Sequence, residues 1–210
     1  VELSNGMIRE TWKRVIGVEV GDIPSITYAE AIDRFGVDNP DLRFEMELFT
    51  ADWGSSEFVV VSNAIADGGT VRGFVLKGGA DASNKFIKKW TEFVKNYRLS
   101  GLLWGKLKED GWSGSLKKIE AELLAQIPGV EEGDLVLLGA GPANHVNTAM
   151  GRLRAHVAKE RNLIPEGKFA FVWVTDFPAF EHDEENDRWV SVHHPFTKPL
   201  DEHIDWLGTE

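Results

Sequence analysis

Two adjacent histidines, His193 and His194, end a largely apolar run and are followed at once by Pro195. Imidazoles can bind a metal ion, transfer a proton or donate a hydrogen bond near neutral pH. Neighbouring side chains of a strand point to opposite faces, so we expect no metal ion shared by this pair, and no third ligand lies near it in sequence. One histidine could face a wet cleft and hydrogen-bond an anionic substrate while the other packs. Both could equally be structural or surface residues, as most strand histidines are.

Two other stretches contain residue types that could do chemistry, and each has a simpler explanation. Residues 139–141 lie between an apolar run and a helical pattern, as in half of a dinucleotide-binding loop, but Asn144 stands where the third glycine should be. A tight strand-to-helix turn explains these glycines. The acidic residues of 181–187 could hold a hard cation, but they lack the glycine and the spacing of a calcium loop. A solvated hairpin tip is the simpler interpretation.

A basic strip runs from Arg72 to Lys108, where nine cations and two anions give a local net charge of 9 − 2 = +7. Such a strip could face a phosphate backbone. The simpler interpretation is the solvated face of a helix and its neighbours. The lysines that we single out as candidate nucleic-acid contacts are Lys85, Lys88, Lys89 and Lys95.

Hydrophobic periodicity indicates the elements that must position these residues. It predicts helices at 1–20, 27–36, 83–97, 115–127 and 142–162. It predicts strands at 57–65, 70–78, 101–109 and 134–140, and an antiparallel hairpin formed by 169–180 and 188–196. This order favours an α+β fold whose middle is a two-layer α/β unit. We expect a flanking segment at 1–48, an inserted domain at 49–163 and a second flanking segment at 164–210, with the two ends forming one domain.

Composition narrows the class of protein. The chain has 210 residues, of which 42% are hydrophobic, as expected for a globular protein that buries a core. It contains no cysteine, which excludes disulfides and thiol nucleophiles and agrees with a cytoplasmic location. No apolar run approaches the ~20 residues of a membrane span, and the first residues lack a signal-peptide layout. The overall net charge of −11 argues against a stand-alone nucleic-acid binder.

Residues 172–199 read VWVTDFPAFEHDEENDRWVSVHHPFTKP. This stretch strongly resembles a motif of the bacterial type of aspartyl-tRNA synthetase. That family carries a W-x-x-DFP-x-F strand, a variable acidic turn and then HHPFT-x-P. The matching residues here are Trp173, Asp176, Phe177, Pro178, Phe180, His193, His194, Pro195, Phe196, Thr197 and Pro199. Residues 27–48 resemble the segment that leads out of the family's catalytic core. The middle block resembles its insertion, the GAD domain, which also occurs in the B subunit of the bacterial tRNA-dependent amidotransferase.

The resemblance implies an activity for the whole enzyme. Such an enzyme joins aspartate to ATP, with Mg²⁺, and then transfers the aspartyl group to tRNA. It has a class II core, an antiparallel sheet flanked by helices, and is a cytoplasmic homodimer without a membrane anchor. The resemblance assigns the aspartate contact to His193, with His194 as its supporting neighbour.

The same resemblance predicts that this chain is inactive alone. The family's F-R-x-E motif and its glycine-rich motif ending in arginine are both absent, because LRFEMEL has the wrong order and GAGPAN leads to no arginine. The carboxylates that hold Mg²⁺ in the family lie beyond Glu210, so we expect neither a catalytic residue nor a bound cofactor in this piece. The alternative is a non-enzymatic GAD-type binding module that contacts tRNA or a partner subunit.

Overall fold

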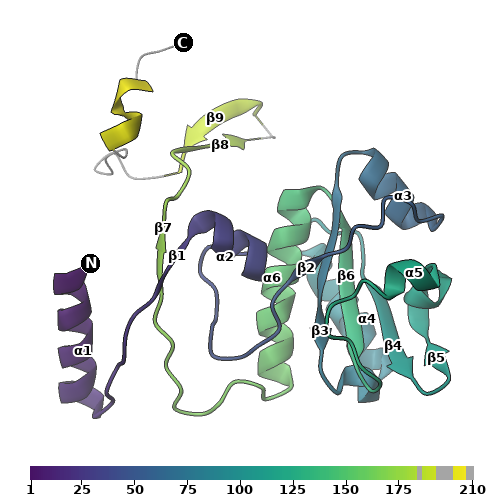
Figure 1. Ribbon diagram of the computed structural model, residues 1–210, viewed down its shortest axis with the longest axis horizontal. Helices are drawn as coiled ribbons and strands as arrows, with labels where there is room; N and C mark the ends of the chain where they lie inside the picture. Colours follow the sequence, from purple (N-terminus) through teal and green to yellow (C-terminus); the bar gives the residue numbers. More distant parts are fainter. Residues whose placement is uncertain (184–185, 193–200, 207–210) are drawn as a thin grey trace.

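The computed structural model describes residues 1–183, 186–192 and 201–206 (Figure 1). The helices are α1 (Glu2–Ile16), α2 (Tyr28–Phe35), α3 (Val59–Ala66), α4 (Asn84–Lys95), α5 (Ala121–Leu124) and α6 (Ala143–Glu160), with 3-10 turns η1 (Gly79–Asp81), η2 (Gly114–Lys118) and η3 (Asp201–Trp206). The strands are β1 (Ser25–Thr27), β2 (Phe49–Thr50), β3 (Thr70–Leu76), β4 (Leu103–Lys108), β5 (Gly111–Trp112), β6 (Leu135–Gly141), β7 (Trp173–Thr175), β8 (Phe180–Asp183) and β9 (Arg188–Ser191).

The middle of the chain folds around a five-stranded antiparallel sheet with the order β2-β3-β6-β4-β5. Strand β6 lies at its centre, and its residues 135–138 are fully buried, as expected for a run of aliphatic residues with no polar break. Figure 1 shows this sheet unit on the right, with α6 lying between the sheet and the rest of the chain. The predicted α+β class is confirmed.

Each face of the sheet has its own hydrophobic core. On one face, α4 and α6 pack against alternate residues of β3 and β6, with the fully buried Trp90 and Met150 in contact with that layer. On the other face, α3, η2 and α5 cover the remaining alternate residues around the fully buried Trp53. Alternate side chains of β6 are therefore buried in two different cores, one on each face of the sheet. This explains why the sequence of the strand is continuously apolar.

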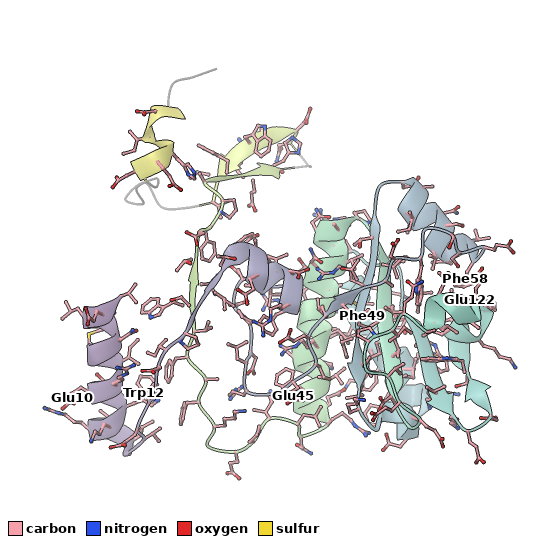
Figure 2. All side chains as sticks on the ribbon, viewed as in Figure 1. Glu10, Trp12, Glu45, Phe49, Phe58 and Glu122 are labelled. Carbon is pink, nitrogen blue, oxygen red and sulfur yellow. The ribbon has the colours of Figure 1, made fainter. Side chains whose placement is uncertain are left out.

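The two ends of the chain meet outside the sheet unit. Strands β1 and β7 pair in parallel, with Ser25 opposite Trp173, although about 150 positions separate them in sequence. Helix α1 lies beside this pair, with Trp12 directed towards the segment that enters β7 (Figure 2). The ring of Trp12 stands edge-on to Phe171 at 5.0 Å, and Asn5 accepts a hydrogen bond from the Trp173 indole at 2.7 Å. The described part of the chain contains no helix long and apolar enough to cross a membrane.

The strand predicted at 57–65 is wrong, because these residues form helix α3. β-branched residues favour strands, but tertiary packing decides. The outer edge of β3 is already paired with β2, so the segment covers the face of the sheet instead. Burial then follows helical spacing: Val61 is fully buried, whereas Val59 and Val60 are exposed.

The single helix predicted at 115–127 is interrupted, with η2 and α5 on either side of an extended step at Ile119 and Glu120. The Glu120 carboxylate accepts hydrogen bonds from the Ser56 hydroxyl at 2.9 Å and from the backbone N–H of Glu57 at 2.8 Å. These contacts connect the break to the loop before α3. The extended backbone at Glu120 lets one carboxylate satisfy two donors that a continuous helix would leave without this partner.

A C-terminal hairpin is present, but only its second strand was predicted correctly: β9 lies within 188–196, whereas β8 occupies the start of the predicted acidic turn and shares only Phe180 with the predicted first strand. The two strands pair from Phe180 opposite Ser191 to Asp183 opposite Arg188. The longer strand predicted at 169–180 is wrong, because β7 ends at Thr175 and pairs with β1 instead. Asp176 turns the chain with φ 56°, and Pro178 then offers no N–H to a ladder.

Candidate functional site

The two candidate histidines, His193 and His194, lie outside the described residues, so their roles stay predictions. The strand that leads to them is described as far as Val192, whose N–H donates to the Ala179 carbonyl at 3.1 Å. The β8–β9 ladder therefore continues to the residue before His193. On the neighbouring segment, the Thr175 hydroxyl donates to the Asp176 carboxylate at 3.0 Å.

The acidic hairpin tip contains no metal cluster within its described part. Across residues 1–183, 186–192 and 201–206, no three His, Asp or Glu side chains gather as metal ligands would. His182 instead contacts Asp187 at 3.1 Å and stands edge-on to the Trp189 ring at 5.4 Å. Asp183 accepts from the Asn186 side chain at 2.8 Å. These contacts are local hairpin contacts, as a solvated tip would make.

The glycine turn at 139–141 does not belong to a dinucleotide-binding unit. Strand β6 is antiparallel to both of its neighbours, whereas a dinucleotide fold needs a parallel strand–helix–strand unit. A Cβ on Gly139 would lie 2.8 Å from Leu99 and 3.3 Å from Met150, so close packing explains the glycine. The Asn144 side chain accepts from the N–H of His145 at 2.8 Å.

The candidate lysines all lie on the exposed face of α4, opposite the buried Ile87, Trp90 and Val94. Two of them are engaged in ion pairs within the chain. Lys89 pairs with Glu160, and Lys95 pairs with Glu92 at 2.7 Å. For Lys85 and Lys88, no ion pair occurs with any residue that the structure describes. These two lysines are therefore the best-placed surface cations of α4 for an external anion.

Several other cations of the basic strip have structural roles. Arg72 is only 6% exposed and binds groups on α2 and α6. Lys106 donates to the Ala82 carbonyl, and Lys77 donates to the Asp134 carboxylate at 3.0 Å. The strip is therefore less available to an external anion than its sequence charge of +7 indicates.

A cleft of about 760 Å³ lies where the segments around α2 and after α6 approach the edge of the sheet. Six of its lining residues are Arg34, Phe35, Phe44, Glu47, Lys77 and Lys168. Arg34 donates to Glu30 at 2.6 Å and also to Glu47. The hydrogen bond from Arg34 holds the pKa of the Glu47 carboxyl below its usual value. Two cations that line the cleft, Arg34 and Lys77, are therefore engaged in hydrogen bonds within the protein. We assign no ligand to this cleft.

Among the described residues, the most buried ionisable side chain is that of Arg154, which the sequence analysis did not single out. Arg154 on α6 is 1% exposed, and burial lowers its pKa to about 10. Its guanidinium donates to the carbonyls of Asp41 at 2.9 Å, Phe44 at 3.2 Å and Met46 at 2.7 Å. The sequence did contain a signal for this site, because Arg154 directly follows Leu153 on the apolar face of the helix. A charge buried there without partners is costly, so its position predicts hydrogen-bond acceptors around it.

The chain matches known proteins over its full length. Residues 61–150 match the GAD domain. The chain is 43% identical, over 100% of its length, to the aspartate–tRNA(Asp/Asn) ligase of Caldanaerobacter subterraneus subsp. tengcongensis. It is 43% identical over 99% of its length to the aspartate–tRNA(Asp/Asn) ligase of Halothermothrix orenii, and 41% identical over 98% to an aspartate–tRNA ligase of Clostridium botulinum. It spans about 37% of the first of these relatives and 36% of the other two.

Proposed function

We propose that this chain, which belongs with the bacterial aspartate–tRNA ligases and contains their GAD domain, forms the insertion domain and two flanking strips of such an enzyme. The observation that carries the proposal is 43% identity along the whole chain. We propose residues 1–48 and 164–210 as strips of a class II core and residues 49–163 as the insertion. The pairing of β1 with β7 supports this division, because it joins the two strips to each other.

The parent enzyme would activate aspartate with ATP and Mg²⁺ and transfer it to tRNA, as a cytoplasmic homodimer. In this scheme His193 contacts the aspartate substrate, and His194 supports it. A histidine there can act by hydrogen bonding or by charge, without removing a proton. The family's ATP-binding motifs are absent from this sequence, so in this scheme other parts of the parent enzyme supply the groups that bind ATP and Mg²⁺.

The purified 210-residue chain is expected to show no aspartate-dependent exchange of pyrophosphate into ATP. Adenylate formation needs positioned cations and metal ions around the phosphates, and this chain lacks the motifs that provide them. The assay is run beside an intact aspartate–tRNA ligase of the same type. Exchange above background by the 210-residue chain would show that it contains a complete adenylate site.

The same assay on the intact enzyme tests the role of His193. His193→Ala should raise the KM for aspartate by about tenfold or more, which corresponds to one lost charge-assisted hydrogen bond, and leave the KM for ATP nearly unchanged. His182→Ala, in the exposed part of the hairpin, is the matched control and should change neither value. Equal effects of the two variants would remove His193 from the site.

The second candidate function is a binding module, which the exposed positions of Lys85 and Lys88 favour. Replacing both with glutamine should weaken tRNA binding and reduce the slope of log affinity against log salt by about 1.4–1.8, because each phosphate contact contributes roughly 0.7–0.9. Lys117→Gln with Lys118→Gln removes the same charge from η2, which covers the other face of the sheet. Equal losses from both pairs, or no binding at low salt, would leave the α4 lysines as solvated surface.

A further inference from the structure

Helix α2 meets the sheet unit through direct backbone contact. Gly36 ends α2 with φ 74°, and a Cβ there would lie 2.3 Å from the carbonyl oxygen of Asn147. Gly151 faces this end from α6, where a Cβ would lie 2.4 Å from the carbonyl oxygen of Phe35. Neither position has room for a side chain. The end of α2 and the middle of α6 are therefore packed as closely as two backbones can be.

Arg72 reinforces this contact from strand β3. Its guanidinium donates to the Ile32 carbonyl at 3.4 Å, to the carbonyl of Asp33, to the Asp33 carboxylate at 2.9 Å and to the Asn147 side chain at 2.6 Å. The last carbonyls of a helix lack partners within the helix and carry partial negative charge. One buried cation thus binds the end of α2 to both β3 and α6.

The chain that follows α2 is held to the same surface. Arg154 of α6 donates to the carbonyls of Asp41, Phe44 and Met46, and its guanidinium stacks on the Phe44 ring at 4.2 Å. This connection is therefore bound to α6 along its length and does not cross open solvent as a free linker.

At its other end, α2 is continuous with strand β1. The Thr27 hydroxyl accepts from the Glu30 N–H at 3.1 Å and caps the helix where β1 stops. Beyond the paired strands, the ring of Tyr28 at the start of α2 lies 5.1 Å from that of Phe177, which follows β7. Figure 1 shows α2 between the β1–β7 pair and α6.

We infer that α2 is a rigid joint, which fixes the strand pair β1–β7 relative to the sheet unit, with Gly36, Gly151 and Arg72 as its positioning residues. The sheet unit then does not swing on the two connections that link it to the strand pair. This inference stands on the packing geometry. Only its consequence, that the α4 lysines keep a set distance from the strand pair that would belong to the enzyme core, rests on the proposed function.

Spin labels on the full chain measure this rigidity directly. The chain has no cysteine, so Ser25→Cys in β1 and Lys117→Cys in η2 give one defined pair of nitroxides. Double electron–electron resonance should show a single narrow distance distribution. Gly151→Ala should broaden or shift that distribution, because the added methyl group displaces α2 while alanine favours helix α6 itself. Activity is not needed for this readout, so the result is independent of the proposed function.

Gly6→Ala is the matched control, since Gly6 is also a helical glycine but has no atom near its Cβ position. It should leave the distribution unchanged. Hydrogen exchange of the β3 and β6 amides reports whether the sheet unit stays folded in each variant. If Gly151→Ala lowers the protection of these amides against exchange, Arg72→Lys is used as the test variant instead. Lysine keeps the positive charge but lacks the planar guanidinium that donates to several acceptors at once. A broad distribution in the parent chain, or an unchanged one in the variant that stays folded, would overturn the inference.

Discussion

Replacing Arg154 with methionine is expected to lower the free energy of unfolding by about 3–5 kcal/mol. Three carbonyls would lose a charged donor in a site where the arginine is only 1% exposed. Three hydrogen bonds to a charged group, at about 1.5–3 kcal/mol each, amount to about 4.5–9 kcal/mol, and removal of the desolvation cost of the buried cation offsets part of this loss. Methionine has a similar length and fills part of the space, so most of the effect reports the lost hydrogen bonds rather than a cavity.

Urea denaturation followed by circular dichroism measures this difference. Arg14→Met is the control: its side chain is 77% exposed and pairs with Glu10 on the same helix, so a change within about 0.5 kcal/mol is expected. A loss below about 1 kcal/mol for Arg154→Met would mean that water replaces the guanidinium at these carbonyls.

Local signals predicted the elements whose ends and faces the sequence itself determines. Helix α2 is an example, because Thr27 caps its start and Gly36 ends it in the left-handed region. Helix α4 is another, with aromatic and aliphatic residues on one face and lysines on the other. Strand β6 was recognisable from its unbroken aliphatic run. In each case, burial and capping in the fold agree with what the isolated segment prefers.

The failures arose where distant parts of the chain decide the outcome. Residues 57–65 favour a strand, but β2 occupies the edge that such a strand would need. The break at Glu120 depends on donors more than 60 positions away, and β7 pairs with a strand about 150 positions earlier. No window of local sequence contains these partners.

The candidate site divides in the same way. The exposed lysines of α4 follow from helical periodicity, and the structure places all four on one exposed face. Their pairing does not follow, because Glu160, the partner of Lys89, comes from another helix. The buried Arg72 was grouped with the surface cations because formal charge alone does not distinguish a solvated cation from one that binds the end of a helix.

Replacing Asp134 with asparagine is expected to lower the free energy of unfolding by about 2–3 kcal/mol at pH 7. The carboxylate is 4% exposed and accepts from the N–H groups of Gly78 and Glu131, both at 2.9 Å, and from Lys77 at 3.0 Å. An asparagine keeps one acceptor oxygen, but its second terminal atom is an NH2 group. This group cannot accept the hydrogen bonds that the replaced carboxylate oxygen accepted. If the NH2 group replaces Oδ1, the Gly78 N–H loses its acceptor; if it replaces Oδ2, both the Glu131 N–H and Lys77 lose theirs.

The pH dependence of this loss identifies the charge as its cause. Burial alone would raise the pKa of Asp134, but the hydrogen bonds from Gly78, Glu131 and Lys77 outweigh it and lower the pKa. A carboxyl whose pKa is lower in the folded state stabilises the protein fully above its unfolded pKa of about 4, and this stabilisation is lost as the pH falls through the folded value. The difference between the parent and Asp134→Asn should therefore shrink as the pH is lowered from 7 towards 3.

Urea denaturation of both proteins across this pH range tests the prediction. Asp110→Asn, in the exposed turn between β4 and β5, is the control and should cost no more than about 0.5 kcal/mol at any pH. Parallel pH profiles for the parent and Asp134→Asn would show that the shape of the side chain, rather than its charge, holds the turn before β6. Convergence at low pH would instead mean that a buried carboxylate fixes this turn and, through Lys77, removes one more cation from the basic strip.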